Sequence, residues 1–178
     1  MTFLNVPNTL TLLRILTIPF IVSMLVKGRY KAALFLFIFA SVTDVLDGLV
    51  ARIAKQQTKL GRFLDPMADK LLLVTSFVTF AVYGWVPMWL TVSFILRDVM
   101  VVIGWVGFYL LHKFIFIRPS ILGKTAIAMQ MTLCAFILIK LNFRDVMPDA
   151  YVFIWITLAC TIISGLHYYY QGFTYKRG

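Results

Sequence analysis

Residues 150–170 read AYVFIWITLACTIISGLHYYY, a stretch that contains no Asp, Glu, Lys or Arg. A helix that crosses a bilayer needs about 20 mostly apolar residues. The apolar residues of this stretch follow one another without the strict alternation that is typical of a half-exposed strand. The stretch therefore predicts a membrane-spanning helix.

Further apolar stretches lie upstream, separated by short segments with Gly, Pro or clustered charge. Lys27-Gly28-Arg29 follows the first stretch, and Tyr83-Gly84 follows the third. Backbone polar groups in a bilayer must be bonded internally, which favours helices for continuous apolar runs. We predict an all-α fold, an integral membrane bundle of six transmembrane helices, as a single domain over 1–178. The predicted spans are 8–26, 32–53, 62–83, 88–111, 121–141 and 150–170.

The composition supports a membrane protein. Of the 178 residues, 61% are hydrophobic and 13% are charged, and the mean hydropathy is +0.90. Soluble domains are about 45–50% apolar and about 25% charged. This composition excludes an ordinary soluble enzyme, a disordered chain and a disulfide scaffold. Cys134 and Cys160 lie inside apolar stretches, where a buried thiol is expected.

The basic residues predict how the bundle is oriented. The chain has 17 Lys and Arg against 7 Asp and Glu, a net charge of +10, which favours contact with membrane lipids and predicts no nucleic-acid partner. One side of the predicted bundle carries the larger basic group, which is Arg52, Lys55, Lys59, Arg62, Lys113, Arg118, Lys124, Lys176 and Arg177. The other side carries Lys27, Arg29, Lys31, Lys140 and Arg144. Cytoplasmic loops are enriched in Lys and Arg, so we predict that the first side, with both termini, is cytoplasmic.

Four aspartates lie within or at the ends of two predicted spans. Asp44 and Asp47 are three residues apart, and Asp65 and Asp69 are four apart, so each pair shares one helix face. An ionisable residue inside a span costs about 2.5–3.5 kcal/mol on insertion scales, which makes it a candidate for function. The short turn between the two spans makes these helices neighbours, so the four carboxylates are expected to converge.

Two interpretations account for these aspartates. Hard oxygen ligands in such numbers suit Mg²⁺ or Mn²⁺, which bridge carboxylates to substrate phosphates. The alternative is a set of buried salt bridges with Arg52, Arg62 and Lys70. We favour the metal site, because Gly48, Ala51 and Gly61 on the same faces leave space for a substrate.

The sequence between residues 44 and 69 fills every fixed position of the pattern D-x2-D-G-x2-A-R-x8-G-x3-D-x3-D. This pattern resembles the signature of the CDP-alcohol phosphotransferase family. The resemblance implies that CDP-diacylglycerol transfers its phosphatidyl group to an alcohol and that CMP is released. It also implies two divalent cations, Mg²⁺ or Mn²⁺, and a homodimer.

The same resemblance assigns roles to residues. Asp44, Asp47 and Asp65 would ligate the metals, and Asp69 would share a metal and act as the general base. Gly48, Ala51 and Gly61 would make room for the nucleotide, and Arg52 would bind phosphate. The active site would lie at the cytoplasmic face.

Segments outside the signature resemble the glycerophospholipid branch of this family. Asn8 and Thr11 are candidate substrate contacts, or else part of a capped first helix. Arg97 is a candidate acceptor-binding residue, or else a partner that Asp98 neutralises. Arg118 and Lys124 are candidate phosphate contacts, or else interfacial anchors.

The acceptor is less sharply indicated. Phosphatidylglycerophosphate synthases of this branch tend to have Arg-Glu at Arg97-Asp98 and a second arginine where this chain has Trp105. We therefore favour phosphatidylglycerol as the acceptor, which gives cardiolipin, with glycerol 3-phosphate as the alternative. A divalent-cation transporter is the alternative from another class, but the four aspartates all lie at one end of two spans, whereas a permeation path needs polar groups throughout.

Overall fold

The structure of the protein is a computed structural model, which describes residues 6–53, 61–112, 121–143 and 146–174. Within these ranges the chain forms six helices and no strand, so the all-α prediction is confirmed. The helices are α1 Val6–Val26, α2 Tyr30–Ile53, α3 Gly61–Val82, α4 Met88–His112, α5 Ile121–Asn142 and α6 Tyr151–Thr174. Their bounds agree with the predicted spans to within a few residues.

Two glycines end helices in the same way. Gly28 and Gly84 both have φ of 70°, a backbone conformation that favours glycine because it has no Cβ. Just after each glycine, a backbone N–H bonds back to the carbonyl five residues earlier, Arg29 to Met24 at 2.8 Å and Trp85 to Phe80 at 2.8 Å. These bonds satisfy carbonyls at the helix ends and reverse the chain after α1 and α3.

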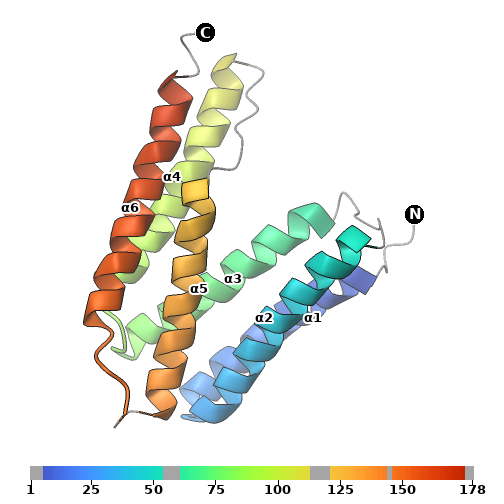
Figure 1. Ribbon diagram of the computed structural model, residues 1–178, viewed down its shortest axis with the longest axis vertical. Coiled ribbons are helices and arrows are strands. Elements are labelled where there is room, and N and C mark those ends of the chain that lie inside the picture. Colours follow the sequence, from blue (N-terminus) through green and yellow to red (C-terminus); the bar gives the residue numbers. More distant parts are fainter. Residues whose placement is uncertain (1–5, 54–60, 113–120, 144–145, 175–178) are drawn as a thin grey trace.

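The helices form two groups (Figure 1). In the view of that figure, α1, α2 and α3 lean to one side, while α4, α5 and α6 stand together on the other. Within the groups, α1 packs against α2 and α3, and α6 packs against α4 and α5. The groups are joined because α5 also packs against α2 and α3, and α4 packs against α3.

The apolar core lies toward the end of the bundle where Gly28 and Gly84 reverse the chain. It draws buried side chains from every described helix, among them Ile21, Leu25, Phe37, Phe77, Phe80, Leu90, Phe94, Leu133, Leu138, Ile154 and Leu158. The buried polar residues Thr11 and Arg14 of α1 lie nearer the other end. The buried charged residue Arg14 therefore lies away from the apolar core, toward the opposite end of the bundle.

The outer surface is apolar as well. Phe35 is 70% exposed and Leu166 is 66% exposed, and many other large hydrophobic side chains are also exposed. By length and composition, two helical stretches among the described residues can cross a membrane, Ile121–Asn142 and Tyr151–Gln171, and Thr11–Val26 is a shorter apolar stretch. Because soluble proteins rarely expose apolar surface on this scale, the fold is consistent with a membrane bundle.

Candidate active site

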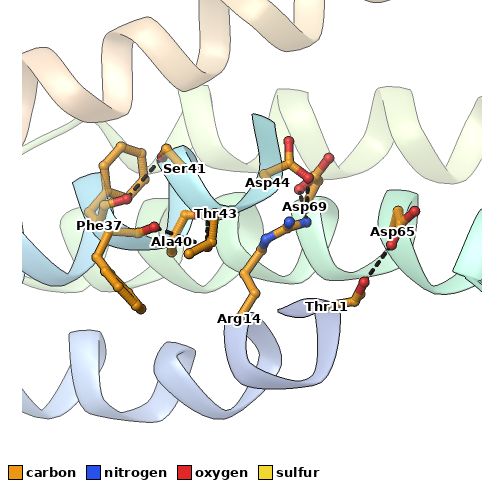
Figure 2. A network of polar contacts seen from close by, with 10 residues as sticks. Thr11, Arg14, Phe37, Ala40, Ser41, Thr43, Asp44, Asp65 and Asp69 are labelled. Carbon is orange, nitrogen blue, oxygen red and sulfur yellow. Dashed lines mark hydrogen bonds and ion pairs between the residues drawn. The ribbon is translucent and has the colours of Figure 1, made fainter. Parts of the chain in front are cut away.

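A buried arginine joins the two aspartate-bearing helices. Figure 2 shows Arg14 extending from α1 to a point between Asp44 of α2 and Asp69 of α3. Its Nη1 atom lies 2.6 Å from Asp44 Oδ1 and 2.9 Å from Asp69 Oδ1. The Arg14 side chain is fully buried, so these ion pairs are poorly screened by solvent. One guanidinium nitrogen therefore holds an oxygen of each carboxylate.

A hydrogen bond one turn earlier on α1 adds a second contact between α1 and α3. Thr11 Oγ1 donates to Asp65 Oδ1 at 2.6 Å. Thr11 and Arg14 are three residues apart on α1, while Asp65 and Asp69 are four apart on α3, so each pair lies on one helix face. The facing rows of α1 and α3 thus fix the positions of Asp65 and Asp69 (Figure 2).

The three carboxylates form a site of high negative charge density. Asp44 and Asp65 both lie close enough to Asp69 to repel its charge. The Asp44 and Asp69 side chains keep 34% and 27% of their surface exposed, so molecules from outside the bundle can reach them. Carboxylate oxygens are the donors that Mg²⁺ and Mn²⁺ prefer, and the donor set therefore fits the predicted metal.

The metal site itself stays a prediction. Among the residues that the structure describes, no group of three or more His, Cys, Asp or Glu side chains is arranged to hold a metal ion. The side chain of the fourth predicted ligand, Asp47, lies outside the described part.

Among the described residues, the cation paired with Asp44 and Asp69 is Arg14, which was not one of those that the sequence suggested. The salt-bridge interpretation used Arg52, Arg62 and Lys70. Lys70 instead lies 3.6 Å from Asp98 Oδ2 of α4, while the side chains of Arg52 and Arg62 lie outside the described residues. From the sequence alone, Arg14 was assigned no role. An arginine inside an apolar span is costly unless it is paired with an acidic residue, so its position could have indicated such a partner.

The predicted nucleotide site is described only in part. Gly48, Ala51 and Arg52 lie on α2 and Gly61 begins α3, but their side-chain surroundings, like those of Asn8, lie outside the described residues. Since α1 begins at Val6, Asn8 lies within the helix and does not cap it. Thr11, the remaining residue of this set, contacts Asp65.

The second group of helices carries a second arginine cluster. Arg97 Nη1 donates to Asp98 Oδ1 at 2.7 Å, and Arg97 Nη2 donates to Ser164 Oγ of α6 at 2.6 Å. This is the geometry of a mutually neutralised pair, and acceptor binding by Arg97 stays a prediction. Lys70 links the cluster to the aspartates, because it follows Asp69 directly and approaches Asp98. Of the other predicted acceptor contacts, Lys124 is exposed on α5, and Arg118 lies outside the described residues.

Comparison with known proteins decides the family. Residues 4–163 of this chain match the sequence model of the CDP-alcohol phosphatidyltransferase family. The chain belongs to this family. The resemblance seen in the signature is thereby confirmed, and the protein is a member of an enzyme family. This membership favours an enzyme over the divalent-cation transporter.

Curated relatives carry two kinds of name. A CDP-diacylglycerol–glycerol-3-phosphate 3-phosphatidyltransferase of Aquifex aeolicus is 30% identical over 176 residues, which cover 96% of this chain and 97% of the relative. One of the same name from Bacillus subtilis is 33% identical over 182 residues, 93% of each chain. A probable CMP-forming cardiolipin synthase of Drosophila melanogaster is 40% identical over 97 residues, 54% of this chain and 30% of the relative. Members of the family are membrane enzymes that generally depend on divalent metal ions.

Proposed function

We propose that this protein transfers the phosphatidyl group of CDP-diacylglycerol to a hydroxyl group of a glycerol-type alcohol and releases CMP. The meeting of Asp44 and Asp69 at Arg14, with Asp65 one turn away on α3, carries the proposal in a chain of this family. The acceptor oxygen forms a bond to the phosphorus of the phosphatidyl group, and the bond from that phosphorus to the CMP oxygen breaks. Asp69 takes the proton of the acceptor hydroxyl as general base.

The aspartates are also the proposed ligands of two divalent cations, Mg²⁺ or Mn²⁺. Asp44, Asp47, Asp65 and Asp69 would hold them, and the bound cations would offset the negative charge of the diphosphate. Two residues of α1 position these ligands. Arg14 holds Asp44 and Asp69 together, and Thr11 orients Asp65.

The nucleotide is proposed to bind beside the carboxylates. Gly48 and Ala51 lie one to two turns beyond Asp44 on α2, and Gly61 lies one turn before Asp65 on α3. These small residues would leave room for the cytidine, and Arg52 would bind a phosphate group. Asn8 and Thr11 of α1 would complete this side of the site.

Phosphatidylglycerol is the acceptor we propose, with cardiolipin as the product. Glycerol 3-phosphate carries a phosphate monoester, which needs more positive charge around it than a phosphodiester does. Arg97 already gives its Nη1 to Asp98, and Trp105 stands where relatives that use glycerol 3-phosphate tend to have a second arginine. Arg97, Arg118 and Lys124 would then bind the single charge of a phosphodiester.

Glycerol 3-phosphate is the second candidate. The relatives that match this chain over nearly its whole length are named as glycerol-3-phosphate enzymes, whereas the probable cardiolipin synthase matches over about half. These names favour the smaller acceptor, and the charge arrangement at Arg97 favours the lipid acceptor.

An acceptor assay tests both the reaction and the acceptor. Purified protein is given CDP-diacylglycerol, Mg²⁺ or Mn²⁺, and one acceptor at a time, and CMP release and the lipid product are measured. We expect CMP and cardiolipin with phosphatidylglycerol, and neither product from the Asp69→Asn variant. Product from glycerol 3-phosphate alone would overturn the acceptor, and the absence of CMP with both acceptors would overturn the reaction.

The bundle is proposed to cross the membrane six times, with the aspartate end at the cytoplasmic face, and to form a homodimer. Single-cysteine variants in a background without Cys134 and Cys160 test the orientation. We expect a membrane-impermeant maleimide to label Lys31→Cys on intact cells and to leave Lys124→Cys unlabelled. The reverse pattern would contradict the orientation, and the mass of the protein in nanodiscs tests the dimer.

A further inference from the structure

A cavity of about 470 Å³ opens at the end of the bundle that lies away from the aspartates. Gly28, Arg29, Lys31 and Ala32 line it from the α1–α2 turn and the start of α2. Leu141 and Asn142 line it from the end of α5. Lys31 and Asp44 lie on the same helix, about 20 Å apart at the rise of an α-helix, so this cavity is separate from the candidate active site.

The cavity carries positive charge that the described residues do not offset. Arg29 and Lys31 are exposed, and neither forms an ion pair within the described part of the chain. Lys140, one residue before Leu141, shows the contrast, because it pairs with Asp149 at 2.6 Å.

An exposed apolar stripe runs from the cavity along α2. Phe35 follows Lys31 by four residues, which places it on the same face. Its side chain is 70% exposed, and the stripe continues through Ile38 and Phe39 to Val42, each at least 46% exposed. Cationic groups at a cavity above a row of exposed apolar side chains match the chemistry of a phospholipid, whose phosphate is anionic and whose chains are hydrocarbon.

We propose that this cavity binds the phosphate group of an anionic phospholipid in the leaflet opposite the aspartates. Its acyl chains would lie along Phe35, Ile38 and Val42. The site also gives a role to two basic residues that membrane topology does not explain, because Arg29 and Lys31 lie on the side where basic residues are normally scarce. The proposal rests on the placement of the bundle in a bilayer and not on the reaction or its acceptor.

Binding of phosphatidylserine to the delipidated full-length protein tests the proposal. This lipid is anionic but has no glycerol hydroxyl in its headgroup, so it is not the proposed acceptor. We expect it to raise the thermal unfolding midpoint and to stay bound in native mass spectrometry. Phosphatidylcholine and inorganic phosphate at equal concentration should do neither. An equal effect of phosphatidylcholine would overturn the role of charge, and an equal effect of inorganic phosphate would overturn the role of the lipid.

Three variants separate a site from general surface attraction. Arg29→Gln and Lys31→Gln should each weaken phosphatidylserine binding about fivefold, the factor that corresponds to about 1 kcal/mol per basic residue near a membrane. Lys27→Gln is the matched control, because it removes the same charge from the same turn but does not line the cavity. Equal weakening in all three variants would overturn the proposal. CMP release should be unchanged in all three, so a failed lipid site is distinguishable from a failed reaction.

Discussion

The two groups of helices each contain an ion-paired arginine, and the partners of these arginines differ. Arg14 binds Asp44 and Asp69, which come from two other helices and lie far away in the sequence. Arg97 binds Asp98, its neighbour on the same helix, and reaches a distant residue only through Ser164. The Arg14 side chain is 0% exposed, and that of Arg97 is 12% exposed.

The different partners give the two arginine clusters different roles. Because Arg14 bonds across helices, losing it leaves two carboxylates without their shared cation and loosens α1, α2 and α3 together. Because Asp98 neutralises Arg97 locally, the second cluster compensates its own charge and adds one bond between α4 and α6. The first cluster therefore organises the proposed catalytic carboxylates, and the second stabilises the region proposed for the acceptor.

The largest expected difference between the clusters is in turnover. Asp69→Asn should lower CMP release about 10²–10⁴-fold, because an amide cannot accept the proton of the acceptor hydroxyl. The variant should still fold and bind CDP. The matched variant Asp98→Asn should lose far less activity, since Asp98 is not a proposed base. Equal losses in both variants would contradict the distinction between the clusters.

Stability distinguishes the two arginines next. Arg14→Gln should lower the free energy of unfolding by about 3–5 kcal/mol, because it leaves two partly buried carboxylates without the fully buried cation that they share. Arg97→Gln should cost about 1–3 kcal/mol, since Asp98 keeps Lys70 nearby. Unfolding is measured with a chelator present, so that a bound metal ion does not replace the missing cation. A larger cost for Arg97→Gln would reverse the comparison.

The Thr11–Asp65 bond gives a smaller effect. Thr11→Val keeps the shape but removes the donor to an ionised carboxylate, which should cost about 1.5–3 kcal/mol. Thr17→Val is the control on the same helix, because within the described residues the Thr17 hydroxyl bonds only to the carbonyl of Leu13 in its own helix. Its effect on the free energy of unfolding should stay within about 0.5 kcal/mol of zero. Similar losses in both variants would show that the tertiary bond adds no stability.

The exposed Lys140–Asp149 pair should matter least. The hydrogen bond and charge of Lys140 hold the pKa of Asp149 below its usual range. Because this pKa is lowered in the folded state, the pair stabilises the fold at pH values above the pKa of Asp149 in the unfolded chain, about 3.9. The stabilisation is lost as the pH falls through the pKa of Asp149 in the folded protein. Asp149→Asn should leave the unfolding midpoint at pH 7 nearly unchanged and reduce its fall in acid. An unaltered acid dependence would contradict the linkage.

The sequence predicted the helices well, because their signals are local. The stretch 62–83 became α3 Gly61–Val82, and the glycines expected to break the chain, Gly28 and Gly84, adopt the conformation that ends a helix. The site was predicted in part for the same reason. Spacings of three and four residues place Asp44 and Asp47, or Asp65 and Asp69, on one face of one helix.

Contacts between distant helices were not predictable from spacing. The partners expected for the aspartates, Arg52, Arg62 and Lys70, were the basic residues next to them in the sequence. Arg14 lies 55 residues from Asp69, and periodicity within a helix carries no information about which other helix packs against it. The turn between α2 and α3 was expected to make these helices neighbours, but their described residues make almost no direct contact, and each helix packs against α1 instead.

The position of Arg14 has a consequence for how the protein is made. In the proposed membrane placement, α1 is synthesised before α2 and α3, so the Arg14 guanidinium would enter the bilayer before Asp44 and Asp69 are made. Inserting an arginine at the centre of a helix costs about 2.5–3.5 kcal/mol on insertion scales. Helix α1 would therefore be unstable in the membrane until α3, which carries Asp69, has been synthesised. With that placement, biogenesis of this enzyme would favour delayed, joint release of α1–α3 from the translocation machinery.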